Sequence, residues 1–266
     1  MTSKKLPTVF VSHGAPTLTL EDVPARRFLK ELGTRFSGIK AVLCISAHWN
    51  TLIPVVNSVK KNGTIHDFYG FPDELYRINY PVPGDPGLAG RVKDLLIKAG
   101  MTCDTDTTRG LDHGAWVPLR LMYPHADVPV VQLSIQRNLD PSHHMALGEA
   151  LTGLREEGVL ILCSGGAVHP LGDPTASLGP GAVTEGWAME FNDWLTAAVT
   201  SGDRESLVNY RLIAPYAERA HPYPDHYMPL LTALGAAGAG ARGAVLHHSW
   251  DLGDLGMDAF AFDQSV

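Results

Sequence analysis

The sequence lacks the features that mark three large classes of protein. Only 3 of its 266 residues are cysteine, and no two of them form a Cys-x-x-Cys pair, so neither a disulfide framework nor a thiolate zinc site is expected. Its 21 Lys and Arg residues are outnumbered by 28 Asp and Glu residues, which argues against nucleic-acid partners and a polybasic membrane anchor. No window approaches the roughly 18 consecutive apolar residues that a membrane span needs.

The N-terminal segment also lacks a targeting signal. MTSKKLPTVFVSHGAP has an apolar run too short for a secretory signal peptide and no small-residue cleavage site. We therefore expect a soluble, cytoplasmic protein. Because 45% of the residues are hydrophobic and no low-complexity linker or repeat divides the chain, we expect a single domain over residues 1–266 with a sizeable core. Cys44 and Cys163 lie in apolar runs, where a buried and inert thiol is the common case.

Apolar runs of strand length alternate with helical patterns along the chain. The runs are nearly continuous, as expected for strands covered on both faces, and they span 8–11, 41–46, 128–135, 158–163 and 243–248. The helical patterns span 25–36, 86–100, 115–124, 143–158, 187–202 and 227–238. This order predicts an α/β fold, with a central, mostly parallel sheet flanked by helices. The Pro- and Gly-rich segments 62–86 and 170–182 are expected to be long ordered loops.

Histidine is abundant, with 12 residues, and the positions of these residues carry more information than their number. His13 follows the strand-like run TVFVS, His48 follows AVLCISA, and His169 follows GVLILC after a short Gly-rich turn. In an open α/β sheet, ligands bind outside the carboxyl ends of the strands. Any one of these residues could be a structural core histidine, but three at equivalent strand ends indicate a shared site.

Two further His residues stand at expected helix starts. His113 lies in LDHGAWVPL, and His226 lies in YPDHYMPLL, where Asp225 is the expected N-cap. Neutral imidazole is the commonest metal ligand and the usual acid or base near neutral pH, so the five residues could serve both purposes. We expect a mononuclear site with open positions, suited to non-haem Fe(II) or catalytic Zn²⁺. The spacing leaves the third ligand open between His226 and three carboxylates: Asp225, Glu185 and Glu218.

The other His residues carry weaker signals. Six are assigned no role in the site: His125, His143, His144, His221, His247 and His248. Of these, His143, His144 and His221 are expected to be exposed on turns or helix ends.

His66 differs from these because it lies in the aromatic segment IHDFYGFP. A loop of this composition is suited to covering a flat ligand, and we expect His66, Phe68 and Phe71 to shape a substrate pocket. A loop that only packs its aromatic side chains on the domain would be equally compatible with the sequence.

Six separate motifs extend these observations over nearly the whole chain. In order they are VFVSHGAP, SAHW, IHDFYGFPDELYRINYPVPGDP, GLDHGAWVPLRLMYPHADVPVVQLSI, SGGAVH and PDHYMPLL. Together they resemble the 4,5-DOPA extradiol dioxygenase family, a branch of the class III, LigB-type extradiol ring-cleaving enzymes. The resemblance is weakest over 170–215, where no family motif is found.

The resemblance implies a ring-opening dioxygenase that uses Fe(II), with Zn²⁺ often bound in its place. Carried over residue by residue, it implies His13, His48 and His226 as metal ligands, whereas the wider superfamily uses two His and a Glu. His169 matches a His near the metal, an acid or base that could also join a zinc ion, and His113 matches a further active-site His. The SGGAVHPLG turn departs from the bulkier SGN-type turn of relatives, which leaves the placement of His169 open.

The substrates implied by the resemblance are a small aromatic diol and O₂. His169 would take the proton of the second hydroxyl, and His113 would steady or protonate the oxygenated intermediate, so that the ring opens to a muconic semialdehyde. DOPA, cleaved at the 4,5 position to seco-DOPA, is one candidate substrate. Two other functions stay open: a zinc-dependent hydrolase that activates water at the same site, and a non-enzymatic binding protein on the same fold. Loss of a metal His would favour the binding protein, and none of the three is lost.

Overall fold

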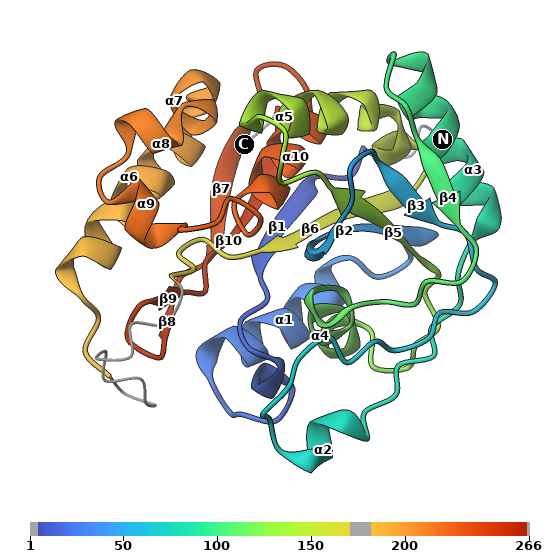
Figure 1. Ribbon diagram of the computed structural model, residues 1–266, viewed down its shortest axis with the longest axis horizontal. Helices are drawn as coiled ribbons and strands as arrows, with labels where there is room; N and C mark the ends of the chain where they lie inside the picture. The colour runs from blue at the N-terminus through green and yellow to red at the C-terminus, as the bar shows by residue number, and fades with distance from the viewer. Residues whose placement is uncertain (1–4, 171–181, 265–266) are drawn as a thin grey trace.

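The computed structural model describes residues 5–170 and 182–264, so the expected loop at 170–182 lies almost wholly outside the described residues. At its centre is an eight-stranded sheet with the strand order β4-β3-β5-β2-β6-β1-β10-β7 (Figure 1). Neighbouring strands in the middle of the sheet run parallel. These are β5 (Val130–Ile135), β2 (Ala41–Asn50), β6 (Val159–Gly165) and β1 (Thr8–Ser12). The predicted α/β fold with a central, mostly parallel sheet is confirmed.

The outer strands introduce antiparallel pairs. β10 (Ala259–Asp263) is antiparallel to both β1 and β7 (Arg242–His247). At the other edge, β3 (Val55–Asn57) pairs antiparallel with β5 and parallel with β4 (Asp104–Asp106). A separate hairpin joins β8 (Trp250–Asp251) and β9 (Leu255–Gly256). The expected strand at 243–248 corresponds to β7, whereas β3, β4 and β10 were not predicted.

Helices cover both faces of the sheet. One face carries η1 (Pro16–Thr19), α1 (Pro24–Arg35) and α4 (His113–Met122). The other carries α3 (Pro86–Lys98), α5 (Pro141–Ala150), α6 (Gly186–Ser201) and α10 (Met228–Ala237). Because side chains alternate along a strand, Val42 and Cys44 of β2 pack in the core on the α4 side, while Leu43 and Ile45 pack in the core on the α10 side.

Shorter elements complete the described chain. They are α2 (Asp73–Tyr76), η2 (Thr152–Glu156), α7 (Arg204–Val208), α8 (Tyr210–Ile213) and α9 (Ala217–Ala220). The helix expected over 143–158 was predicted too long, because α5 ends at Ala150 and a tighter 3₁₀ turn follows it. Within the described ranges, no helix is both long and apolar enough to cross a membrane.

The three cysteines are free and buried. Burial raises the pKa of the Cys44 and Cys163 thiols well above its usual value, and it raises the pKa of Cys103 to about 11. Thiols that stay protonated are poor nucleophiles and poor metal ligands, so Cys44 and Cys163 are inert core residues, as their apolar surroundings in the sequence suggest.

Candidate metal centre

Five histidine rings gather near the carboxyl ends of β1, β2 and β6. They belong to His13, His48, His113, His169 and His226. The rings of His13 and His48 are 4.9 Å apart between centroids, and that of His226 lies 5.2 and 4.9 Å from them. The ring of His113 lies 3.9 Å from that of His48, and the ring of His169 stacks on that of His226 at 3.6 Å. Residues far apart in the chain thus form one cluster.

The strands place His13 and His48 in different ways. His13 follows β1 directly, and its backbone N–H donates to the carbonyl of Gly165 at 3.0 Å. His48 was expected to follow its strand, but it lies inside β2, which continues to Asn50. The pairing of β2 with β5 shifts register between Ile45 and Asn50, an irregularity that the apolar run could not reveal.

A close approach of α4 to the sheet brings His113 to the cluster. Asp112 caps this helix, because its Oδ1 accepts the backbone N–H of Ala115 at 3.1 Å. The next residue after His113 is Gly114, where a Cβ atom would lie 2.4 Å from Ser46 Oγ and 2.9 Å from His48 Cδ2. Any side chain at Gly114 would therefore push α4, and with it His113, away from His48.

His226 lies just before α10 rather than at its start. The helix begins at Met228 with Tyr227 as its N-cap residue, so Asp225 does not cap it as expected. Instead, Asp225 Oδ1 accepts the backbone N–H of His226 at 3.0 Å and lies 3.3 Å from His226 Nδ1. This carboxylate therefore holds the ring of His226 in place.

The other two carboxylates weighed as third ligands lie at the start of α6 and on α9, which contacts α6. Glu185 accepts hydrogen bonds from Arg219 and Trp187, the former at 2.8 Å. Glu218 is the second residue of α9. Neither residue belongs to the lining of the pocket at the His cluster.

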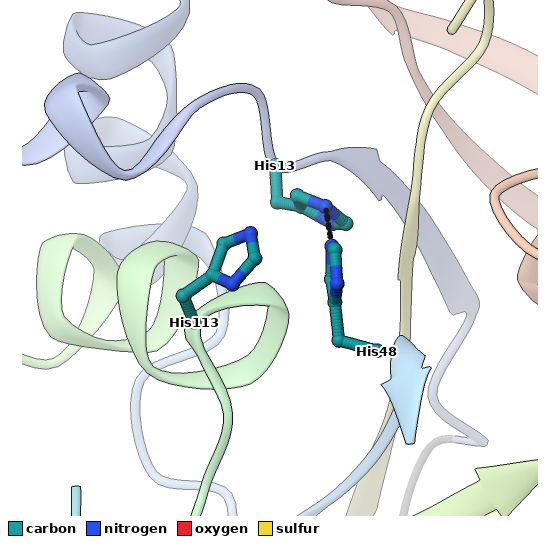
Figure 2. Close-up of side chains that lie close together, drawn as sticks. All are labelled: His13, His48 and His113. Atoms are coloured by element: carbon teal, nitrogen blue, oxygen red, sulfur yellow. Dashed lines mark hydrogen bonds between the residues drawn. The ribbon is translucent and has the colours of Figure 1, made fainter. Parts of the chain in front are cut away.

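The ring nitrogens at the centre of the cluster are spaced like ligands of one ion. His48 Nε2 lies 3.0 Å from His13 Nε2 and 3.2 Å from His226 Nε2. His13, His48 and His113 offer nitrogens that all lie within 4.8 Å of one another (Figure 2). Two nitrogens bound to one ion at about 2.1 Å would be separated by roughly 3.0–3.4 Å at common coordination angles. The cluster is therefore a buried group of His side chains suited to holding a metal ion.

In His13, His48 and His226 the other ring nitrogen, Nδ1, has a partner on the side away from the centre of the cluster. His13 Nδ1 lies 2.9 Å from Ser164 Oγ, and His48 Nδ1 lies 3.7 Å from Asp67 Oδ2. Together with Asp225 beside His226 Nδ1, these contacts fix the ring orientations, as outer partners do in metal sites.

Burial keeps the rings neutral. The pKa values of His13 and His226 lie well below the usual value. Burial is the largest cause, and neighbouring His rings lower these pKa values further. Burial likewise lowers the pKa of His48 to about 3. Since only the neutral ring has a free lone pair for a cation, the donor set fits a divalent metal without prior loss of protons at neutral pH.

A pocket of about 300 Å³ opens onto the cluster. His13, His48, His113 and His169 line it, together with Phe68 and Phe71 of the aromatic loop. His66 does not belong to this lining: its Nε2 lies 3.0 Å from the carbonyl oxygen of Ile78, and its ring lies 5.8 Å from that of Phe68. A direct contact of His66 with substrate stays a prediction, whereas Phe68 and Phe71 form the pocket wall.

Sequence reasoning missed one part of the pocket lining and one residue that contacts the His cluster. Leu252, Asp254 and Leu255 of the β8–β9 hairpin line it, but this hairpin has too few residues to give a strand pattern. Asp67 contacts two of the five His residues, and its place within the aromatic motif was the only signal that could have drawn attention to it.

Two predictions of exposure were wrong. His144 and His221 are fully buried. His144 Nε2 accepts the backbone N–H of Gln136 at 3.2 Å, and His221 Nε2 lies 3.0 Å from the carbonyl oxygen of Ala167. Burial lowers the pKa of each ring to about 3. Short polar sequences around them suggested turns, but tertiary packing covers both rings.

Comparison with known proteins agrees with the fold. Residues 7–260 match the model of the LigB family, the catalytic LigB subunit of aromatic ring-opening dioxygenase. The chain therefore belongs to this family of extradiol aromatic ring-opening dioxygenases. The family resemblance of the six motifs is confirmed.

Individual relatives cover nearly the full chain. It is 47% identical to 4,5-DOPA dioxygenase extradiol from Beta vulgaris, over 96% of each chain. It is 39% identical to the protein of the same name from Escherichia coli K12, over 89% of this chain and 87% of the relative. Among solved structures, an uncharacterised protein from Escherichia coli K12 is similar with a TM-score of 0.79 and 32% identity, covering 96% of this chain and 99% of that one.

Proposed function

We propose that the protein opens the ring of a catechol-type substrate with O₂ at a ferrous iron held by His13, His48 and His226. One observation carries the choice of ligands. The Nε2 atom of His48 lies 3.0 and 3.2 Å from those of His13 and His226, while the Nδ1 atoms of the three rings face outer partners. Neutral imidazoles with open coordination positions suit non-haem iron.

His113 is the competing third ligand, because its ring shares the compact group with His13 and His48. We assign it a different role. Asp67 Oδ2 lies 3.0 Å from His113 Nδ1, and the ring lines the substrate pocket. A ring oriented in this way can hold or deliver a proton at the nitrogen that faces the substrate.

The chemistry that ferrous iron supplies when bound is acidification of both catechol hydroxyls and electron transfer to O₂. Residues of the chain handle the protons and the position of the ring. Burial lowers the pKa of His169, so its ring is neutral and can accept the proton of the second hydroxyl. His113, on the other side of the cluster, would accept the proton of the first hydroxyl at its pocket-facing nitrogen and donate it again as the ring opens.

Phe68 and Phe71 would hold the flat substrate. Their rings meet edge to face at 5.4 Å and form one wall of the pocket. A wall of this kind excludes water from a reacting ring and limits its tilt.

DOPA is the first substrate to test. The relatives from Beta vulgaris, Mirabilis jalapa and Escherichia coli K12 are all named 4,5-DOPA dioxygenase extradiol. Cleavage of DOPA in the same manner would yield seco-DOPA. Simpler catechols belong in the same panel, because the metal-binding diol is common to all of them.

The test is purification without oxygen, loading with Fe(II), and a panel of catechols followed by O₂ uptake and by the absorbance of a yellow product. We expect O₂ consumption and product to rise together in the iron form and to be absent in a zinc form, since Zn²⁺ has no redox chemistry. Full ring cleavage by a rigorously iron-free zinc form would contradict the proposal. If the zinc form instead hydrolyses an added test ester without O₂ uptake, the protein is a hydrolase.

A further inference from the structure

Asp67 connects the aromatic loop to the His cluster. It stands between His66 and Phe68, and its carboxylate reaches the first residue of α4. Oδ1 accepts the backbone N–H of His113 at 2.9 Å, and Oδ2 lies 3.0 Å from His113 Nδ1. Oδ2 is also 3.7 Å from His48 Nδ1. One side chain from a loop thus contacts both the backbone and the ring of His113.

The two oxygens of Asp67 make different contacts. Oδ1 ties the loop to the N-terminus of α4, which any hydrogen-bond acceptor could do. Oδ2 faces a ring nitrogen, and a carboxylate oxygen at this distance favours a proton on that nitrogen, because two lone pairs would repel each other. The two atoms are close, but they do not meet hydrogen-bond geometry, so the carboxylate acts on the ring N–H mainly through ion–dipole attraction.

We infer that Asp67 is a positioning residue that keeps the proton of His113 on Nδ1 and leaves Nε2 to face the substrate pocket. This inference rests on the proposed function, because it assigns His113 to proton handling. In the opposite tautomer Nε2 would carry the proton, so it could not accept one from the substrate at the start of each catalytic cycle. Asp67 also links this ring to Phe68, the next residue and part of the pocket wall.

The test compares two substitutions of Asp67. Asp67→Asn retains an oxygen that can accept the backbone N–H of His113, but its amide would turn N–H groups toward Nδ1. Asp67→Ala removes both contacts. The matched control is Asp85→Asn, because Asp85 also accepts a backbone N–H, from Leu88 at 2.9 Å, at the start of α3.

In the iron-loaded enzyme we expect Asp67→Asn to lower kcat by about 10²-fold or more, within the roughly 10²–10⁴-fold range of general acid–base effects. KM and iron content should stay near the wild-type values. Asp67→Glu should recover part of the lost kcat, because it restores the charge, and Asp85→Asn should behave as wild type. If Asp67→Asn keeps wild-type kcat while Asp67→Ala loses stability, Asp67 is only a tether and the inference fails.

The inference would also fail if Asp67→Asn lost enough iron to account for its lost activity. Asp67 would then act by holding the metal ligand His48. A second readout does not depend on turnover. Ring-nitrogen chemical shifts of labelled histidine, measured in the zinc form and assigned with a His113→Gln variant, should report the Nδ1–H tautomer in wild type and the Nε2–H tautomer in Asp67→Asn. If no catechol is cleaved by wild type, the proposed function fails while this measurement still decides the tautomer.

Discussion

At the scale of single residues, the environment of the two ring nitrogens determines what each histidine can do. His13 and His226 turn one nitrogen to an outer oxygen and the other to the centre of the cluster. His221 is equally buried, but its Nε2 faces the carbonyl of Ala167 and its Nδ1 has no hydrogen-bond partner in the described structure. Burial alone therefore does not distinguish a candidate ligand from a core histidine.

The first prediction separates the ligands from the proton-handling residues. His226→Ala should remove a direct bond to the metal, so bound iron and activity should fall together. His113→Ala and His169→Ala should keep the iron and lower turnover by roughly 10²–10⁴-fold. Metal content by mass spectrometry, measured beside single-turnover rates, checks both. Retention of full iron in His226→Ala with its loss in His113→Ala would make His113 the third ligand.

The second prediction concerns acid stability of the metal-free protein. Burial holds the pKa of His144 at about 3, below the unfolded value near 6.5. Above pH 6.5 the ring is neutral in both states, but at lower pH the unfolded chain takes up a proton that the folded state cannot bind. Stability should therefore fall as pH drops from 6.5 toward 3, with a slope of up to about 1.4 kcal/mol per pH unit from this ring.

Denaturant unfolding between neutral pH and about pH 5 measures that slope. His144→Gln should make the slope shallower, while the exposed His125→Gln should leave it unchanged. An equal slope in all three proteins would show that His144 is protonated in the folded state.

At the scale of elements, the packing of α4 on α1 supports the position of His113. The two helices approach closely at Gly33, where a Cβ atom would lie 2.0 Å from the carbonyl oxygen of Met122. An exposed glycine in another helix, Gly90 of α3, has open space around it. The pair offers a direct comparison of helix propensity with packing.

The third prediction uses this pair. Gly90→Ala should stabilise the protein by up to about 1 kcal/mol through helix propensity. Gly33→Ala should destabilise it by about 1–3 kcal/mol, because overpacking outweighs the same gain. Thermal and denaturant unfolding measure both changes. Stabilisation by Gly33→Ala would mean that α1 and α4 can separate without cost.

Much of the element order could be predicted, and the failures have physical causes. The parallel central strands are long apolar runs, because both of their faces are covered, so each was found. β3 and β4 have three residues each, too few for any periodicity, and their pairing depends on neighbours distant in the chain. The convergence of the His residues could be expected from the strand ends. The contacts of Asp67 and the burial of His144 could not, since tertiary packing determines both.

At the scale of the whole molecule, a metal that binds only the folded state should stabilise all of it. A ligand present at about 1,000 times its Kd adds about 4 kcal/mol. The fourth prediction is therefore that Zn²⁺ or anaerobic Fe(II) raises Tm by several degrees, as read by scanning calorimetry. His48→Ala should lose this increase, and His125→Ala should keep it. An undiminished increase in His48→Ala would place the metal elsewhere.

The position of β1 has a consequence for biosynthesis. This strand, which leads to His13, pairs with β6 on one side and with β10 on the other, and Ser12 and Asp258, which are hydrogen-bonded to each other, lie 246 positions apart. On the ribosome β1 would emerge long before β10, so both of its edges can be paired only after β10 has followed. The metal centre would then mature only after translation of its domain is nearly finished, and a nascent chain stalled before β10 would lack the second neighbour of β1.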